Sequence, residues 1–193
     1  MSGLLAAYQS QLAKRPLAVP IATTAFLFGT GDVISQQAIE KKGSAHEFAR
    51  TGRMALYGGA FFAPLVTQWY KLLQRIQFPG SPMKENIARV AADQLIFAPF
   101  GTGLFFTVLG LLEGNDPRKK LEDGYKTALL TNWKIWPAVQ LANFSLVPLQ
   151  HRLLVVNVVS LGWNSYLSWL NTQTNQGGNR PRSEVLEAVR KTA

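Results

Sequence analysis

Cysteine is absent from this sequence of 193 residues, and histidine occurs only twice. Without cysteine, neither a disulfide framework nor a thiolate metal site can form. His46 lies in a charged stretch and His151 lies beside Arg152, and neither has a second histidine or an acidic residue at the spacing of metal ligands. A glycine-rich phosphate-binding loop is missing as well. We therefore predict that the protein has no metal site and no cofactor.

Charge is missing from five long stretches, at residues 16–31, 54–70, 94–112, 135–150 and 153–179. A helix that spans a bilayer needs about 20 mostly apolar residues. The stretches therefore predict an all-α fold, an integral membrane helical bundle with four to five membrane helices. The mean hydropathy is only +0.04, because charged residues crowd into the connections. The alternative is a soluble helical protein, but 193 residues offer few polar helix faces to cover these stretches.

The chain reads as a single membrane domain, because no linker or low-complexity tract divides residues 1–193. Residues 17–172 form the predicted bundle, with helices at 17–37, 50–75, 85–113, 121–150 and 153–172, and residues 173–193 form a polar tail. We expect kinks at Pro64 and Pro99 and a break near Pro137. Residues 1–16 lack acidic side chains, which suits either a weak mitochondrial import signal or, as we favour, an interfacial helix that the mature protein keeps.

The net charge of +9 is spread over the connections and forms no dominant patch. A nucleic-acid-binding protein would gather basic residues on one face with accessible aromatic side chains, whereas here the aromatic residues lie in the apolar stretches. We therefore expect a lipid bilayer with anionic headgroups as the partner, and no nucleic acid. The basic residues are similar on both sides, so the sequence leaves the orientation open, and it leaves open whether the protein is a homo-oligomer.

Two helical stripes carry polar side chains inside the apolar stretches. Gln140 and Asn143 fall on the same stripe as Trp133 and Trp136, where lipid cannot satisfy their amides. They serve either as hydrogen-bonding links between helices or as the lining of a wet path. The second stripe, in the last predicted helix, suits a bundle interior or a channel wall and consists of Asn157, Ser160, Asn164, Ser168 and Asn171.

Two carboxylates lie where charge is costly in a membrane, at Asp32 and Asp93. Arg89 lies one helical turn before Asp93 and could pair with it, whereas Asp32 has only Gln36 and Ser35 as polar neighbours along its helix. If a lumen exists, we expect both carboxylates to give it a preference for cations. The candidate pore or polar-interior residues are thus Asp32, Gln36, Asp93, Gln140, Asn143, Asn157 and Asn164.

The two carboxylates also suggest an alternative, an intramembrane aspartyl protease, because residues 29–32 have the Gly-x-Gly-Asp form of those enzymes. Such an enzyme needs two aspartates that share a proton. The Pro-Ala-Leu element that follows in those proteases is missing, and Asp93 follows two alanines where they have a tyrosine. We therefore predict that the protein is not an enzyme.

Three motifs in the second half of the chain resemble a known family. They read W-x-x-W-P-x-x-Q-x-x-N-F from residue 133, V-P-L-Q-H-R from residue 147 and W-N-x-Y-L-S from residue 163. They are similar to the Mpv17 family, which includes the twenty-two-kilodalton peroxisomal membrane protein. The motif sequences most resemble those of its fungal mitochondrial inner-membrane members. The likeness covers about residues 8–170 and rests on Trp133, Trp136, Pro137, Phe144, Pro148, Gln150, His151, Arg152 and Trp163.

The resemblance implies a multi-pass protein of the mitochondrial inner membrane, with the peroxisomal membrane as the alternative. It further implies a pore or carrier for small metabolites or ions that supports mitochondrial metabolism and stress tolerance. The residues themselves support only a membrane bundle with polar groups inside. The alternative function is therefore a membrane scaffold or assembly factor that transports nothing, in which those polar groups hold helices together.

Overall fold

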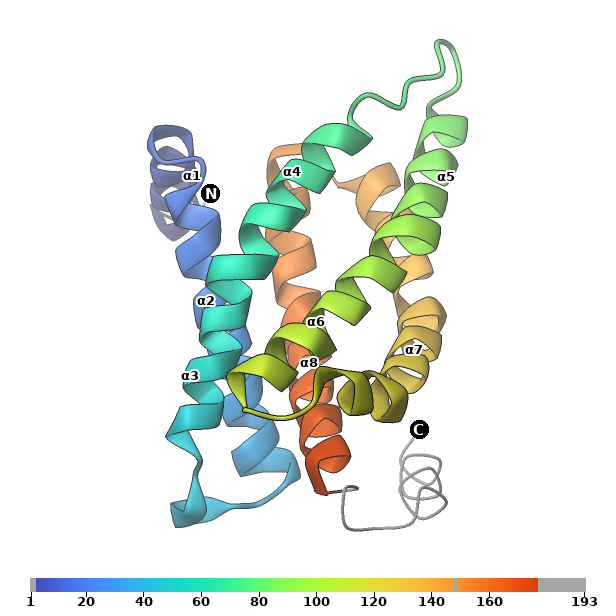
Figure 1. Ribbon diagram of the computed structural model, residues 1–193. Helices are drawn as coiled ribbons and strands as arrows, with labels where there is room; N and C mark the ends of the chain where they lie inside the picture. The colour runs from blue at the N-terminus through green and yellow to red at the C-terminus, as the bar shows by residue number, and fades with distance from the viewer. Residues whose placement is uncertain (1–2, 148, 177–193) are drawn as a thin grey trace.

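The computed structural model describes residues 3–147 and 149–176, and this part of the chain is helical with no strand (Figure 1). A short helix α1 (Gly3–Lys14) precedes five long helical rods. The rods are α2 with η1 (Ala18–Ile34, Ser35–Ile39), α3 with η3 and α4 (Phe48–Leu56, Tyr57–Phe62, Ala63–Leu73), α5 with η4 and α6 (Pro82–Ala92, Asp93–Phe97, Ala98–Leu112), α7 (Pro117–Leu146) and α8 (Leu149–Gln176). The expected all-α bundle is thus confirmed in its class.

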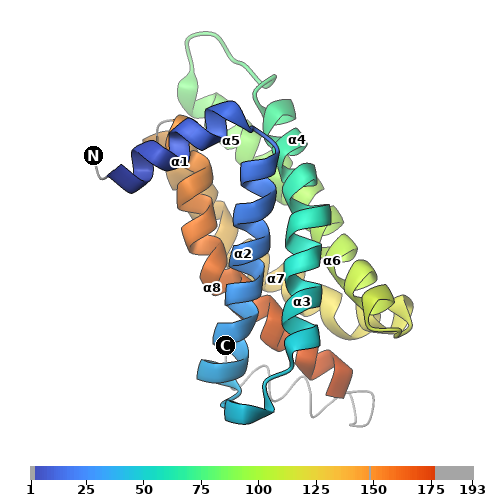
Figure 2. The same ribbon diagram turned by 90° about the vertical axis from the view of Figure 1, so that its left-hand side faces the viewer.

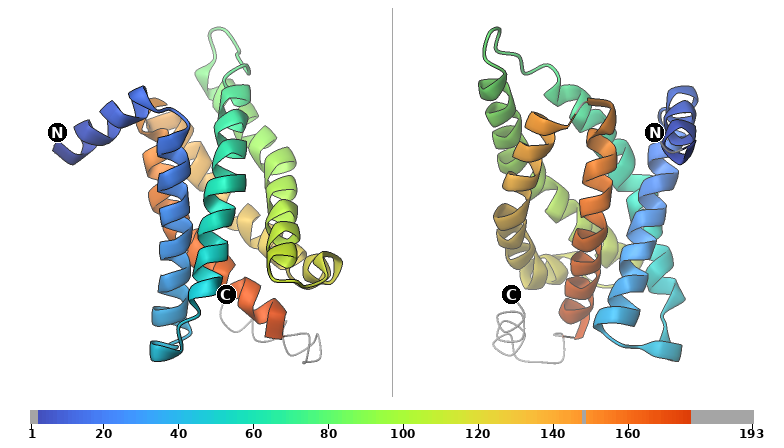
Figure 3. Two further views of the ribbon diagram at one scale, coloured as in Figure 1. Left: turned by 60° about the vertical axis from the view of Figure 1, so that its left-hand side comes forward. Right: turned by 180° about the vertical axis from the view of Figure 1, so that it is seen from behind.

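The connections gather at two ends of the bundle (Figures 1 and 3). One end, which we call the α1 end, carries α1, the connection from α4 to α5 and the junction of α7 with α8. The other end carries the connection from α2 to α3, which includes the short 3-10 turn η2 (Gly43–Ala45), and the turn from α6 to α7. Helix α1 lies across the direction of α2 (Figure 2), as an interfacial helix would.

Helix α2 packs against α8, α3 and η3, and α7 packs against both α6 and α8. Glycines allow the closest of these contacts. A Cβ atom on Gly31 would lie 2.8 Å from the Asn164 Cβ of α8, and one on Gly58 would lie 2.7 Å from the Phe28 Cγ. The apolar core between the rods includes Phe28, Met54, Tyr57, Phe105, Phe106 and Leu109.

Three rods contain a π-helical turn, and two of these turns come immediately before a proline. The residue before each proline donates its backbone N–H five residues back, Ala63 to the Gly58 carbonyl and Ala98 to the Asp93 carbonyl. Proline has no N–H and its ring crowds the carbonyl four residues earlier, so a wider turn relieves that contact. The expected kinks at Pro64 and Pro99 stay predictions.

The break expected near Pro137 was wrong. Helix α7 continues through Pro137 from Pro117 to Leu146, and the chain leaves the helix only at Val147, whose φ and ψ are −99° and 125°. A proline can remain inside a membrane helix when neighbouring helices accommodate the freed carbonyl. The interruption therefore lies ten residues later than expected.

Two of the rods are long and apolar enough to cross a membrane, Ala18–Ile39 and Pro82–Leu112, with mean hydropathies of 1.3 and 2.0. At 1.5 Å per residue the shorter one is about 33 Å long, which matches a hydrocarbon core of about 30 Å. Large apolar side chains on the outer surface fit a lipid-facing exterior, among them Phe26, Leu95, Ile96, Phe100, Leu111 and Val158. The four to five spans that we expected remain a prediction for the other rods.

Helix α8 continues to Gln176, beyond the expected end at residue 172. Residues 177–193, which hold most of the expected polar tail, lie outside the described residues, as does Pro148.

Candidate functional site: a polar cavity inside the bundle

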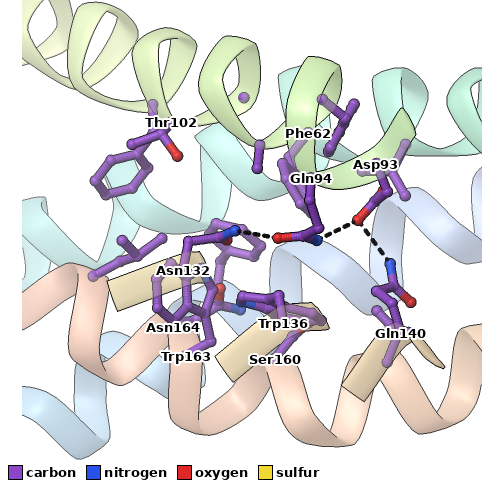
Figure 4. A pocket seen from close by; sticks show the side chains of 18 of the residues that line it. Phe62, Asp93, Gln94, Thr102, Asn132, Trp136, Gln140, Ser160, Trp163 and Asn164 are labelled. Carbon is purple, nitrogen blue, oxygen red and sulfur yellow. Dashed lines mark hydrogen bonds between the residues drawn. The ribbon is translucent and has the colours of Figure 1, made fainter. Parts of the chain in front are cut away.

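A cavity of about 90 Å³ lies between the rods, where η3 and α4, η4 and α6, α7 and α8 face one another. Its volume is enough for several water molecules, since one needs roughly 10–15 Å³ of such space. Aromatic and aliphatic side chains form most of its wall, and a strip of polar side chains runs along it (Figure 4). The polar residues of the lining are Asp93, Gln94, Thr102, Asn132, Gln140, Ser160 and Asn164.

Hydrogen bonds link the polar strip from α7 to η4 and back to α7 (Figure 4). The Asn132 Nδ2 donates to the Gln94 Oε1 at 3.0 Å, and the Gln94 Nε2 donates to the Asp93 Oδ2 at 2.9 Å. The Gln140 Nε2 also donates to the Asp93 Oδ2, at 3.2 Å. Asn143 extends the chain behind the cavity, because its Nδ2 donates to the Gln140 Oε1 at 3.4 Å. Gln140 and Asn143 thus face the interior, as the stripe predicted.

Asp93 lies at the centre of this chain and is only 5% exposed. A third donor, the Trp69 Nε1 of α4, reaches its Oδ1 at 3.0 Å. The expected pair with Arg89 is not formed, because the Arg89 Nη2 contacts the Glu85 Oε2 at 3.0 Å instead. Within the described residues no basic side chain is paired with Asp93. Its carboxylate instead accepts hydrogen bonds from neutral donors beside the cavity.

Two cavity-lining residues carry polar atoms that bond to none of the described residues. They are the Nδ2 and Oδ1 of Asn164 and the Nε1 of Trp136, all of them buried. Burying an amide without a partner costs roughly 1–3 kcal/mol. The arrangement therefore offers a donor and an acceptor on α8, a donor on α7 and a carboxylate on η4 to water or to a small polar solute.

The second stripe divides between two sites. Ser160 and Asn164 line the cavity, whereas the Ser168 hydroxyl donates to Asp32, outside the cavity. Asn157 lies on α8, but its side chain is outside the described residues, and the same holds for Asn171.

Sequence reasoning missed several members of the cavity, among them Gln94, Asn132 and Tyr70. Asn132 could have been found, because it lies one helical turn before Trp136 on the stripe that already held Gln140. Tyr70 comes from a different rod, and its hydroxyl accepts from the Gln140 Nε2 at 3.2 Å. Periodicity along one helix carries no signal for such a partner.

Asp32 and Gln36 do not line this cavity. Asp32 is fully buried, and its Oδ1 lies 2.7 Å from the Arg50 Nε of α3. The Arg50 Nη2 lies 2.6 Å from the Glu40 Oε1, and the Gln36 Nε2 donates to the Asp32 Oδ2 at 2.7 Å. Asp32 has no cation along its own helix, as we expected. Arg50 of the next rod supplies one instead. This cluster is an ion-pair network at the end opposite α1.

The aromatic motif residues hold α7 against its neighbours. Trp136 is buried and packs edge-on against Trp163 of α8, with ring centroids 6.1 Å apart. Trp133 is 41% exposed, but its Nε1 donates to the Gln94 carbonyl at 2.9 Å. Phe144 is buried at the other end of the motif.

Arg152 ties the junction between α7 and α8. Its Nη2 and Nε donate to the carbonyls of Phe144 and Val147, at 2.7 and 2.9 Å. Gln150 and His151 lie on α8, but their side chains are outside the described residues.

Comparison with known proteins agrees with this architecture. Residues 110–168 match the family described as Mpv17 / PMP22. The chain is 54% identical to Protein sym-1 of Neurospora crassa, over 88% of this chain and 100% of the relative. It is 47% identical to the mitochondrial inner membrane protein Mpv17 of Xenopus laevis, over 88% of this chain and 97% of the relative. No solved structure matches the chain.

The relatives cover nearly the whole bundle, the Xenopus laevis relative is named as a mitochondrial inner membrane protein, and neither name is that of an enzyme. The protein is therefore a protein of the mitochondrial inner membrane, in agreement with the apolar rods. At these identities and coverages, the chain belongs to the Mpv17 / PMP22 family.

Proposed function

We propose that the protein is a pore or carrier for small metabolites or ions, and that the polar cavity is part of the solute path. One observation carries this proposal: Asn164 and Trp136 line the cavity and carry buried polar atoms without a partner among the described residues, and the same wall holds Asp93, which pairs with no described basic side chain. A purely structural interior would pair such groups with each other, because each orphan costs stability. Solvent or solute in the cavity satisfies them instead.

The proposal needs the remaining rods to cross the bilayer as well. The rods at residues 48–73, 117–146 and 149–176 contain 26 or more residues each, and a span needs about 20. In the rods 48–73 and 149–176 the charged residues lie near the ends, where Lys and Arg can reach the headgroups. In α7 they lie in the first ten residues, apart from Lys134, which is exposed on the outer surface. The cavity lies within a single copy of the chain, so a homo-oligomer would carry one such path per copy.

A scaffold or assembly factor is the second candidate, and the hydrogen-bonded part of the strip favours it. Asn132, Gln94 and Gln140 form an interhelical chain that includes Asp93. Such bonds contribute about 0.6–2 kcal/mol each to helix association without any transport. The two functions differ in whether solute passes.

Selectivity tests the role of Asp93. Single-channel or bulk recordings on purified protein in lipid bilayers give the ratio of potassium to chloride permeability. Asp93→Asn should lower this ratio, because the carboxylate is the cavity's unpaired charge. Asp32→Asn is the matched control and should leave the ratio unchanged, because Arg50 neutralises Asp32 away from the cavity. An unchanged ratio in Asp93→Asn would remove this residue from the path.

A pair of substitutions on α7 separates the path from the interhelical links. Gln140 lines the cavity and Asn143 does not, although both are buried and lie in the same chain. Gln140→Leu should reduce both solute flux and stability, the latter by roughly 0.6–2 kcal/mol. Asn143→Leu should leave flux near wild type. Equal flux in both variants at wild-type level would favour the scaffold.

A further inference from the structure

A second hollow lies at the α1 end of the bundle, separate from the polar strip. It is a cleft of about 290 Å³ between α1, α2, α4 and the junction of α7 with α8. One part of its wall is apolar and includes Leu12, Pro16, Pro20, Val66, Leu73 and Phe144. The other part holds three basic side chains, Lys71, Arg89 and Arg152, and no acidic residue lines it.

The two arginines line this cleft and have hydrogen-bonding capacity left over. Arg152 uses its Nε and Nη2 on backbone carbonyls, and its guanidinium lies 5.6 Å from the centre of the Phe144 ring. Arg89 uses its Nε and Nη2 on the carbonyls of Leu73 and Ile76 and on Glu85. In the described part of the chain, neither Nη1 has a partner. No described carboxylate pairs with Arg152.

These positive groups lie close enough to affect each other. Burial lowers the pKa of the Arg152 guanidinium, and the charge of Arg89 lowers that pKa further. Like charges held together are unfavourable without an anion, and the Glu85 contact compensates only Arg89. Lys71 adds an exposed ammonium to the same cleft. The cleft therefore has a charge that an anion would balance.

The shape of the cleft limits which anion fits. Planar guanidinium groups bind phosphate oxygens through paired N–H donors, and lysine adds a point charge. The adjoining apolar wall would remain in water beside a free inorganic ion, but an acyl chain would cover it. Helix α1, which supplies Leu12, lies across the bundle end where headgroups of a bilayer would be (Figure 2).

We propose that this cleft binds the phosphate of an anionic phospholipid, with Arg89, Arg152 and Lys71 on the headgroup and an acyl chain along the wall formed by Leu12, Pro16 and Pro20. Through Arg152 and Leu12, the α7–α8 junction and α1 contact the same lipid. The headgroup residues Lys71, Arg89 and Arg152 line the cleft and not the cavity, although the two share Val66 and Tyr70 of α4.

Native mass spectrometry of the full-length protein in detergent tests this site. Added dioleoyl phosphatidylglycerol should remain bound in preference to dioleoyl phosphatidylcholine, at one molecule per chain. Lys71→Gln and Arg152→Gln should each weaken phosphatidylglycerol binding by about tenfold, as expected for loss of a charge-assisted contact. Arg75→Gln is the control, because Arg75 is exposed at the same end and does not line the cleft; it should bind like the wild type.

Thermal unfolding with added ligand separates lipid from free phosphate. Phosphatidylglycerol should raise the unfolding temperature of the wild type and of Arg75→Gln, but raise it less for Lys71→Gln, a surface change that leaves the backbone contacts of Arg152 in place. Stabilisation by sodium phosphate alone, with no added effect of phosphatidylglycerol, would overturn the lipid assignment in favour of a soluble phosphate. Equal phosphatidylglycerol binding by wild type, Lys71→Gln and Arg152→Gln would overturn the site itself.

Discussion

Among single residues, Arg50 has the largest predicted effect on stability. It is buried and contacts Asp32 and Glu40, with closest distances of 2.7 and 2.6 Å. Arg50→Met leaves the fully buried Asp32 without its cation and Glu40 with Lys42 alone, which should cost about 3–5 kcal/mol. The measurement is the free energy of unfolding in mixed detergent micelles. Arg75→Gln, an exposed arginine, should change it by less than about 0.5 kcal/mol, and a similar loss in both variants would contradict the network.

The same network predicts a dependence of stability on pH. Burial raises the pKa of the Glu40 carboxyl, but hydrogen bonds from Arg50 and Ser35 and the charges of Arg50 and Lys42 outweigh it, so the pKa lies below its ordinary value of 4.5. The unfolded state then binds protons first as the pH falls. Glu40 therefore stabilises the fold fully above about pH 5 and loses this contribution as the pH drops through its folded-state pKa.

Unfolding midpoints measured between about pH 6 and about pH 3 check this dependence. The wild type should lose stability over the acidic part of this range, and Glu40→Gln should lose less, because the group that takes up the proton is gone. Parallel pH profiles for the two proteins would show that Glu40 does not contribute.

At the residue scale, the sequence predicts which side of a helix is buried better than it predicts which residues a side chain contacts. The 3.6-residue period placed Gln140 and Asn143 on the buried side of α7, and both are buried. The pairing of Asp32 with Arg50 could not be read in this way, because it depends on how α2 and α3 pack. For Asp93, the nearest cation along the helix was the obvious choice, but Glu85 lies one turn on the other side of Arg89 and takes it.

At the scale of elements, close packing of α2 depends on glycine. Gly31→Ala places a Cβ 3.0 Å from the backbone N of Ser165, and Gly58→Ala places one against the Phe28 ring. Each should destabilise the bundle by about 1–3 kcal/mol, because a helix or a core ring must move. Gly52→Ala is the control, since its Cβ meets nothing within 4 Å. It should be neutral or stabilising by up to about 1 kcal/mol.

The same unfolding assay in detergent measures all three glycine variants. A loss of stability in Gly52→Ala as large as that in Gly31→Ala would mean that local backbone preferences, and not helix contacts, set the effect.

The helix bounds predicted from the sequence agree with the rods to within a few residues, but proline alone did not locate the interruptions. Pro137 lies inside a continuous helix, whereas the chain bends out at Val147 just before Pro148. The residue that precedes a proline disfavours the helical conformation, which applies at Val147. At Pro137 the preceding residue, Trp136, stays helical and is packed against Trp163. Packing between helices decided between the two prolines, and one sequence does not contain that information.

For the whole molecule, our central claim is that the polar cavity of the membrane bundle is part of a path for solute. Asn164 is the most informative position, because it lines the cavity and both of its amide atoms are buried without a partner among the described residues. Replacing it with leucine removes an unpaired buried amide of similar size. Stability should therefore stay the same or rise. The path, in contrast, loses one hydrogen-bond donor and one acceptor.

Efflux of a small charged solute from liposomes that contain the purified, folded protein tests this claim most directly. The account predicts efflux above that of protein-free liposomes for the wild type, and reduced efflux for Asn164→Leu at equal or greater unfolding temperature. Wild-type protein that is folded and inserted but gives no efflux would contradict the transport path and leave the scaffold as the function of this bundle.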